Sequence, residues 1–184
     1  MLPSLKWVPS PNFSARHGER VDLLVLHDTE GSYEGSISWF ASKISGVSAH
    51  FVIKEDGNEV TQMVDICDKA WHACAFNGRS IGFEMAGFAA KGFGSPEWNA
   101  VANIIASHLH HLQIPIRWAR GGVGPGFCSH YDLGQAGGGH RDPTTDSAVW
   151  TKFVGLVQDA YNVGNFPPLW IAEHERTKCG LAEK

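Results

Sequence analysis

Short apolar runs along the chain predict the strands of a buried sheet. Residues 21–26 are mostly apolar, a pattern that is typical of a buried strand, and His27 stands at the end of this run. Residues 48–64 are interrupted by Asp56-Gly57, a strong hairpin signal, which predicts two strands joined by a tight turn. The full set of expected strands comprises residues 21–26, the two arms of 48–64, 80–87 and 114–119.

Three other segments place apolar residues at helical spacing. The most regular begins with Ser95 as a capping residue and Pro96 at the first helical position, and its apolar face extends to Leu112. The expected helices are residues 34–45, 95–112 and 149–161, the last of them starting near Thr145 and Asp146.

The glycine-rich segment 121–143 is predicted to be a functional loop. It contains too much glycine for regular structure and is too long for an incidental connection between two elements. Residues after Asn165 show no periodicity, and we expect a tail that packs on the domain or is partly disordered. No internal repeat or linker divides the chain, so we expect a single domain over residues 1–184.

Composition and charge limit the possible functions. With 43% hydrophobic and 18% charged residues, the 184-residue chain is a typical globular protein that can bury a core without disulfide bonds. Its formal net charge of −4 and the absence of a Lys/Arg cluster argue against a nucleic-acid-binding protein. The first 20 residues contain no continuous apolar stretch, so we expect cytoplasmic synthesis without a signal peptide, and no run reaches membrane-spanning length. The four cysteines lack a CxxC spacing, and we expect them to be mostly free and structural.

Three histidines and one aspartate stand out in the sequence. Most histidines in proteins lie on the surface or are hydrogen-bonded in the core. His27, however, ends a predicted strand. His130 and His140 lie in the glycine-rich segment, and Asp142 follows two residues later. Two neutral imidazoles and one carboxylate would leave the fourth position of a tetrahedral ion to water, which is typical of a catalytic zinc site.

Four motifs occur in an order that resembles one protein family. They are VLHDTEG, SAHFVIKEDG, AWHACAFNGRSIGFEMAG and CSHYDLGQAGGGHRDP. From about Val21 to Phe153 the chain is similar to zinc-dependent N-acetylmuramoyl-L-alanine amidases of the amidase-2 type, which include bacteriophage endolysins and are related to peptidoglycan recognition proteins. The resemblance implies an α/β fold with a central mixed β-sheet flanked by helices. Residues 1–20 would form an N-terminal extension and residues 165–184 a C-terminal tail, with no separate cell-wall-binding domain.

The resemblance also assigns the metal ligands, and it implies one zinc ion per chain. The three positions that match the family's ligands are His27, His130 in CSHYD and Asp142 in HRDP. Thr144 stands where the family usually has glycine, so the turn after Asp142 is left undetermined. His140 with Asp146 remains an alternative pair, although its spacing would be unusually short for the family.

Two residues are expected to carry out the acid–base and electrostatic work. The family's glutamate beside the metal corresponds to Glu84, and His140 occupies the position where relatives often have lysine. The catalytic tyrosine of some relatives is replaced by Ala49, so Glu84 would act as the general base. The alternatives are a hydrogen-bonded structural carboxylate for Glu84 and a solvent-exposed loop residue for His140.

Four further residues are candidates for contact with substrate. His50 and His72 recur in the family pattern along the groove for the sugar–peptide junction, although each could instead be structural. Asn77 and Arg79 follow in the same motif, and a guanidinium can bind a stem-peptide carboxylate.

The resemblance implies hydrolysis of the amide bond between N-acetylmuramic acid and L-alanine of the peptidoglycan stem peptide. We expect a monomeric phage endolysin that acts on the bacterial cell wall after holin-type release, with no nucleic-acid partner and no membrane span. Two alternatives stay open: a non-catalytic peptidoglycan-binding protein on the same fold, and a bacterial recycling or toxin amidase.

Overall fold

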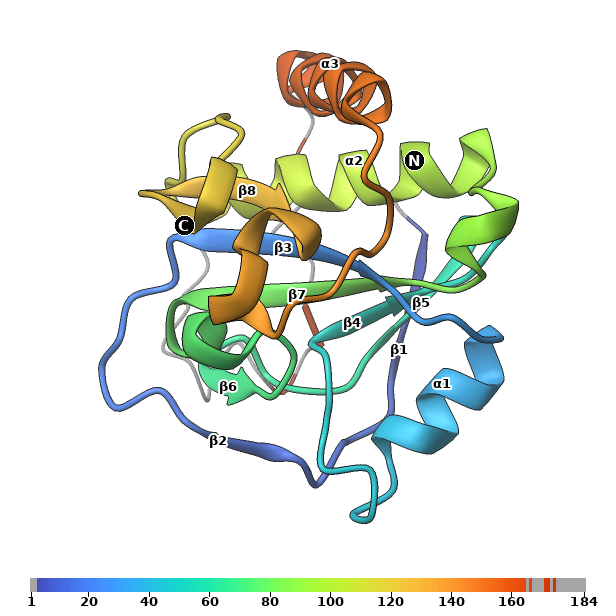
Figure 1. The fold of residues 1–184 in the computed structure, drawn as a ribbon, viewed down its shortest axis with the longest axis vertical. Coiled ribbons are helices and arrows are strands. Elements are labelled where there is room, and N and C mark those ends of the chain that lie inside the picture. Colours follow the sequence, from blue (N-terminus) through green and yellow to red (C-terminus); the bar gives the residue numbers. More distant parts are fainter. Residues whose placement is uncertain (1–2, 165, 167–170, 173, 175–184) are drawn as a thin grey trace.

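A mixed sheet of six strands forms the centre of the computed structural model, which describes residues 3–164, 166, 171–172 and 174. The strands follow the order β1-β5-β4-β7-β3-β8 across the sheet (Figure 1). They are β1 (Ser4–Trp7), β3 (Leu23–Asp28), β4 (Phe51–Ile53), β5 (Glu59–Gln62), β7 (Ser80–Met85) and β8 (Gly126–Ser129). β4 and β5 form an antiparallel hairpin, and the other neighbouring pairs of this sheet are parallel. A separate antiparallel pair joins β2 (Phe13–Ala15) to β6 (Asp68–Ala70).

Helices cover both faces of the central sheet. α2 (Ser95–His111) and α3 (Ser147–Val163) lie together over one face, and α1 (Tyr33–Phe40) lies on the other side (Figure 1). The main core contains buried side chains of α2 and of the sheet, whereas Tyr33 and Phe40 belong to a second cluster with Val52. The described residues also form the short 3₁₀ helices η1 (Cys74–Arg79), η2 (Ala89–Lys91), η3 (Arg120–Gly122) and η4 (Tyr131–Gly137). The expected α/β fold with a mixed sheet flanked by helices is confirmed.

Alternation along β3 separates the main core from the candidate site. Leu24 and Leu26 point into the main core, whereas Leu23 and Val25 belong to a smaller cluster on the opposite face. Because the side chains of a strand alternate between its two faces, His27 continues on the side of Leu23 and Val25. The strand therefore buries apolar side chains on both faces and still presents His27 at its C-terminal end.

The expected helices are present, and one of them is shorter than its apolar pattern. The helix expected over residues 34–45 ends at Phe40. The Asn12 side chain donates hydrogen bonds to the carbonyl oxygens of Phe40 and Ser42, at 3.3 and 2.8 Å. These bonds hold the chain in a turn, so the apolar spacing of Ile44 does not continue the helix.

The prediction of a strand at residues 114–119 is wrong. This segment forms an isolated β-bridge, between Trp118 and Phe127, and not a strand. β8 lies instead inside the glycine-rich segment that the pattern assigns to a loop. A Cβ on Gly126 would overlap the Arg117 carbonyl oxygen, and its φ of 146° favours glycine. Glycine here permits a close backbone approach within a strand, so glycine content does not exclude regular structure.

The described part of the chain also bears on several smaller expectations. Cys74 and Cys128 are free, but Cys67 is disulfide-bonded, so the expectation of a free thiol is wrong at that position. Most of the tail expected after Asn165 lies outside the described residues, although Ile171 is buried against the main core.

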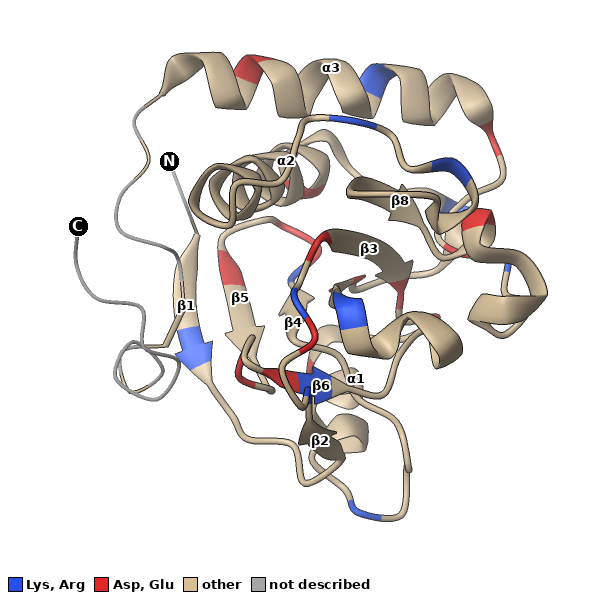
Figure 2. Cartoon of the chain, turned by 90° about the vertical axis from the view of Figure 1, so that its left-hand side faces the viewer, with Lys and Arg blue, Asp and Glu red and all other residues tan. Residues whose placement is uncertain are grey.

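No described helix is long and apolar enough to cross a membrane. Lys and Arg are spread over β1, β6, α3 and the loops rather than gathered in one place (Figure 2).

Candidate metal centre

Three side chains that could hold a metal ion meet at the C-terminal ends of two strands. β3 and β8 are parallel neighbours, so their ends lie side by side, and they deliver His27 and His130. Asp142 reaches the same place on the loop after η4. The His130 N–H donates to the Leu26 carbonyl oxygen at 2.9 Å, and the Tyr131 N–H donates to the Asp142 carbonyl oxygen at 3.1 Å. Backbone hydrogen bonds therefore fix both the second strand end and the returning loop.

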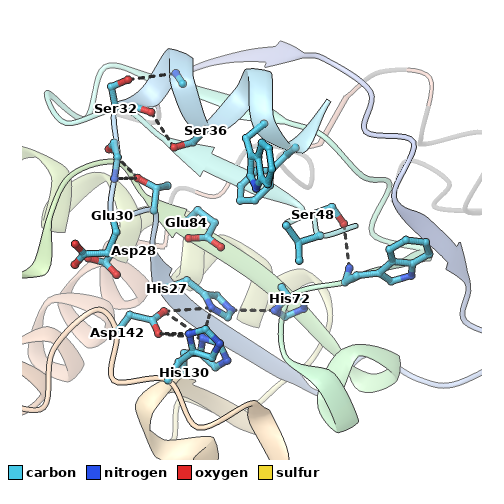
Figure 3. A pocket seen from close by; sticks show the side chains of 18 residues that line it. His27, Asp28, Glu30, Ser32, Ser36, Ser48, His72, Glu84, His130 and Asp142 are labelled. Atoms are coloured by element: carbon cyan, nitrogen blue, oxygen red, sulfur yellow. Dashed lines mark hydrogen bonds and ion pairs between the residues drawn. The ribbon is translucent and has the colours of Figure 1, made fainter. Parts of the chain in front are cut away.

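The donor atoms of these residues converge on one point (Figure 3). The Nδ1 atoms of His27 and His130 are 2.9 Å apart. The Asp142 carboxylate lies 3.1 Å from His130 Nδ1 and 3.5 Å from His27 Nδ1. One donor atom of each residue lies within 4.8 Å of the other two. Both imidazoles are buried, at 2% and 4% exposure, so water screens these atoms poorly.

Burial and mutual contacts set the charges of the three groups. Burial lowers the pKa of His27 to about 4, so this imidazole is neutral at pH 7. Burial opposes ionisation of Asp142, but hydrogen bonds with His130 and His27 outweigh it and hold the carboxyl pKa well below its usual range. For His130, burial opposes the charged form, but the Asp142 carboxylate raises the pKa above its ordinary value. The centre thus combines imidazole nitrogens with an anionic carboxylate.

The surroundings leave these donor atoms available to a cation. The His130 Nε2–H donates to the Gly137 carbonyl oxygen at 2.8 Å, so the ring can offer Nδ1 on the side of His27. Asp142 Oδ1 is buried and has no hydrogen-bond partner among the described residues. Lone pairs and a carboxylate that face one another repel unless a cation or a proton lies between them. The residues therefore fit a divalent metal ion with three protein ligands and one open position.

The alternative pair of His140 and Asp146 does not form. The Asp146 carboxylate caps α3, where it accepts a hydrogen bond from the Ala148 N–H at 2.8 Å. The His140 side chain is 62% exposed, and its Nδ1 lies 3.8 Å from Asp142 Oδ1. Its ring stacks on that of His130, with 4.5 Å between the centroids. His140 therefore lies beside the three donor residues and lines the same pocket.

Glu84 lies on the same face of the sheet as His27. The two residues are register partners on the parallel strands β7 and β3. Glu84 is 7% exposed, and its Oε2 is buried without a hydrogen-bond partner among the described residues. Burial, and then the charges of Asp142 and Asp28, raise the pKa of this carboxyl well above its usual value. A buried carboxyl with a raised pKa beside a candidate metal centre is suited to proton transfer.

The four predicted substrate-contact residues fall into two groups. His72 lines the pocket beside the candidate metal centre, whereas His50, Asn77 and Arg79 are not among its described lining residues. His50 is fully buried, at 0% exposure. Asn77 Oδ1 accepts a hydrogen bond from the His72 N–H at 3.0 Å, and Arg79 Nε donates to the Asp22 carboxylate at 2.6 Å. Asn77 therefore holds the backbone beside the pocket, whereas His50 accepts a hydrogen bond from the Gly82 N–H of β7 at 3.0 Å and Arg79 binds at the other end of β3.

The candidate centre opens into a cavity of about 550 Å³. The cavity lining includes residues that sequence reasoning missed, among them Trp39, Phe40, Trp71, Asp28 and Glu30. Two signals were available. Trp39 is an apolar residue off the core-facing side of a predicted helix, and it is 53% exposed. Asp28 and Glu30 closely follow His27, so a strand that ends at the site also brings them near.

Comparison with known protein sequences gives a family for the chain. Residues 17–146 match the sequence profile of the amidase-2 family, described as N-acetylmuramoyl-L-alanine amidase. An N-acetylmuramoyl-L-alanine amidase A from Achromobacter lyticus is 42% identical over 96 residues, which are 51% of this chain and 52% of that protein. The match thus spans about half the length of this curated relative.

Solved structures share the fold at low sequence identity. Staphylococcus aureus hydrolase AmiA, in complex with its ligand, has a TM-score of 0.71 and 18% identity, covering 91% of this chain and 89% of that one. A selenomethionine derivative of AmpD has a TM-score of 0.64 and 24% identity, covering 85% and 99%. A mutant endolysin from Bacillus subtilis has a TM-score of 0.64 and 15% identity, with the same coverage. Because the family profile covers most of the chain, this protein belongs to the N-acetylmuramoyl-L-alanine amidase family of the amidase-2 type.

Proposed function

We propose that this chain hydrolyses the amide bond between N-acetylmuramic acid and L-alanine in peptidoglycan, with one zinc ion held by His27, His130 and Asp142. The observation that carries the proposal is the convergence of two imidazoles and one carboxylate beside Glu84. The description of the family and the name of the Achromobacter lyticus relative supply the substrate.

Each residue has its own task in the proposed reaction. Bound zinc would supply Lewis-acid chemistry, which polarises a carbonyl group and lowers the pKa of water. Glu84 accepts a proton from the attacking water and delivers it to the departing nitrogen of L-alanine. His140, at the exposed side of the centre, donates an N–H hydrogen bond to the oxyanion that develops on the amide carbonyl. The raised pKa of Glu84 suits a carboxyl group that first accepts a proton and then gives it up.

The proposed biological role is that of a monomeric phage endolysin that reaches the cell wall through holin-type release. This role rests on the resemblance of the motifs to that branch of the family. A peptidoglycan-binding protein without activity is the competing hypothesis. The complete set of three donor residues and the buried Glu84 disfavour it, because a protein that only binds needs neither.

Digestion of purified sacculi, followed by mass spectrometry of the products, tests the proposed activity. The expected products are stem peptides with a free N-terminal alanine. The Glu84→Gln variant keeps the shape of the side chain and is the matched control, which should release almost none. Products that retain the muramic acid linkage, or no products from zinc-loaded protein, would contradict the proposal. A parallel digestion of soluble muropeptides separates an endolysin, which should prefer sacculi, from a recycling amidase.

A further inference from the structure

We propose that His72 and Ser80 are positioning residues that fix the tautomer of His27 through a chain of hydrogen bonds. These hydrogen bonds leave His27 with one nitrogen lone pair, and that lone pair faces His130 and Asp142. The proposal rests on the metal centre of the proposed function. It gives His72 a task different from the substrate contact that the sequence predicts.

The direction of each hydrogen bond follows from a count of protons. The Ser80 hydroxyl donates its one proton to the Phe76 carbonyl oxygen at 2.8 Å. The hydroxyl oxygen can then only accept from His72 Nε2, which lies 3.1 Å away. A neutral imidazole that is protonated at Nε2 has its lone pair at Nδ1. His72 is therefore a hydrogen-bond acceptor at Nδ1.

The chain of hydrogen bonds ends at His27. His27 Nε2 lies 2.9 Å from His72 Nδ1, so it must carry the proton of this hydrogen bond. The lone pair of His27 is then on Nδ1, which lies 2.9 Å from His130 Nδ1 and 3.5 Å from the Asp142 carboxylate. A ligand imidazole whose second nitrogen donates a hydrogen bond keeps one orientation and one tautomer. Both nitrogens of His72 are engaged, which leaves neither for a hydrogen bond to substrate.

The structure around His72 holds its ring in place. The ring lies against Gly82 of β7, where a Cβ would stand 2.6 Å from His72 Nδ1. The His72 N–H donates to Asn77 Oδ1 at 3.0 Å, which anchors the backbone. Ser80 is fully buried, at 0% exposure, so water does not compete for its hydroxyl. Packing therefore sets the chain of hydrogen bonds from Ser80 through His72 to His27, here called the relay, before any metal binds.

Nitrogen-15 NMR of the metal-free protein reads these tautomers without zinc or substrate. We expect both His27 and His72 to be protonated at Nε2. Protonation of His27 at Nδ1 would overturn the relay and would leave the proposed amidase activity unaffected. If the tautomers are as expected but the zinc-loaded wild-type protein shows no amidase activity, the result would count against the proposed function alone.

Zinc affinity, measured by competition with a chelator, tests the same relay through variants. His72→Phe removes the acceptor and should weaken zinc binding by about 10- to 100-fold. It should also change the visible spectrum of the cobalt-substituted protein. His72→Gln, whose side-chain oxygen can accept the hydrogen bond, should recover part of the affinity. Ser80→Ala should weaken zinc binding by a smaller factor, because His72 then loses the hydrogen bond that favours its acceptor tautomer.

Ser107→Ala is the matched control for Ser80→Ala. Ser107 is also fully buried, and its hydroxyl has no partner among the described residues. The control should leave zinc affinity unchanged. Wild-type zinc affinity in Ser80→Ala, or in a folded His72→Phe, would overturn the relay. A raised KM for a muropeptide in His72→Phe would then return His72 to substrate binding. Ser80→Ala is a small change, so the test holds even if His72→Phe does not fold.

Discussion

His27 and Glu84 occupy the same register position on two neighbouring parallel strands. The two buried strands β3 and β7 therefore place a proposed metal ligand and the proposed base on the same face of the sheet. A shift of strand register by one residue would separate them, but it would also turn Leu24 and Leu26 away from the main core. Asp142 and His140, in contrast, come from the loop after η4, so the rigid half of the centre lies in the sheet.

Alanine variants should separate the proposed ligand Asp142 from the helix cap Asp146. Asp142→Ala should lose zinc, because two imidazoles alone form an incomplete site. Asp146→Ala should keep zinc but lower the free energy of unfolding by about 1 kcal/mol, because it removes the side chain that caps α3. Zinc content and denaturant unfolding measure the two effects. A zinc-loaded Asp142→Ala beside a zinc-free Asp146→Ala would reverse the ligand assignment.

Glu84→Gln should separate metal binding from catalysis. The variant should keep zinc and cell-wall binding but lose roughly 10²-fold or more of the turnover, because an amide cannot accept the proton. Single-turnover hydrolysis of a defined muropeptide provides the measurement. Glu97→Gln is the matched control, since Glu97 is buried but is not among the described residues that line the pocket. Turnover near that of the wild type in zinc-loaded Glu84→Gln would remove Glu84 from its role.

Glu97 should make the stability of the fold depend on pH. It is 1% exposed, its Oε1 has no partner among the described residues, and burial followed by the charge of Glu55 raises its pKa to about 8. The native state therefore keeps a proton that the unfolded chain, with an ordinary pKa of 4.5, releases. The stability that this group contributes is present below pH 4.5 and is lost as the pH rises toward 8.

Thermal unfolding from pH 5 to 9 measures this dependence. Glu97→Gln should be more stable than the wild type by about 1 kcal/mol or more at pH 8, and the difference should shrink toward pH 5. Parallel curves for Glu97→Gln and the wild type would show that Glu97 is ionised in the native state.

Two glycine variants should have opposite effects on stability. Gly126→Ala should lower the free energy of unfolding by about 2 kcal/mol or more, because the new Cβ overlaps the Arg117 carbonyl oxygen at an unfavourable φ. It should also weaken zinc binding, since His130 follows β8 directly. Gly155→Ala, in α3 with open space around the new Cβ, should raise the free energy of unfolding by about 0.5–1 kcal/mol. Denaturant unfolding of the metal-free protein compares them, and equal effects would contradict the assigned role of Gly126.

Local sequence signals predicted the parts of the fold that depend on local chemistry. The apolar run before His27 and the turn at Asp56-Gly57 each follow from neighbouring residues, and each is found in the structure. The long helix is also found, but its cap was predicted wrongly: Gly94 is the N-cap of α2, and Ser95, the expected cap, is its first helical residue and makes no capping hydrogen bond. β8 was not predicted, because its glycine pattern is typical of a loop. Gly126 instead allows the backbone to pass close to the Arg117 carbonyl oxygen, which the local sequence does not show. β1, β2 and β6 have three or four residues each, too few for a periodic pattern.

The candidate site shows the same division. The family motifs predicted the donor residues, which the structure brings together. They also pointed to His72, but its hydrogen bonds depend on Ser80, and only the three-dimensional arrangement shows which nitrogen carries the proton. The acidic and aromatic walls of the cavity come from separate elements, so no local pattern marks Trp39 and Trp71 as neighbours of one pocket.

Titration of metal-free protein with zinc, with release of stem peptides from sacculi as the readout, tests the central claim most directly. The account predicts almost no release of stem peptides without zinc. The rate should rise until about one zinc per chain has been added and should then level off. His130→Ala should show no such rise, because it lacks one of the three donor side chains. Full activity of the metal-free protein, or a rate that does not respond to zinc, would contradict the account.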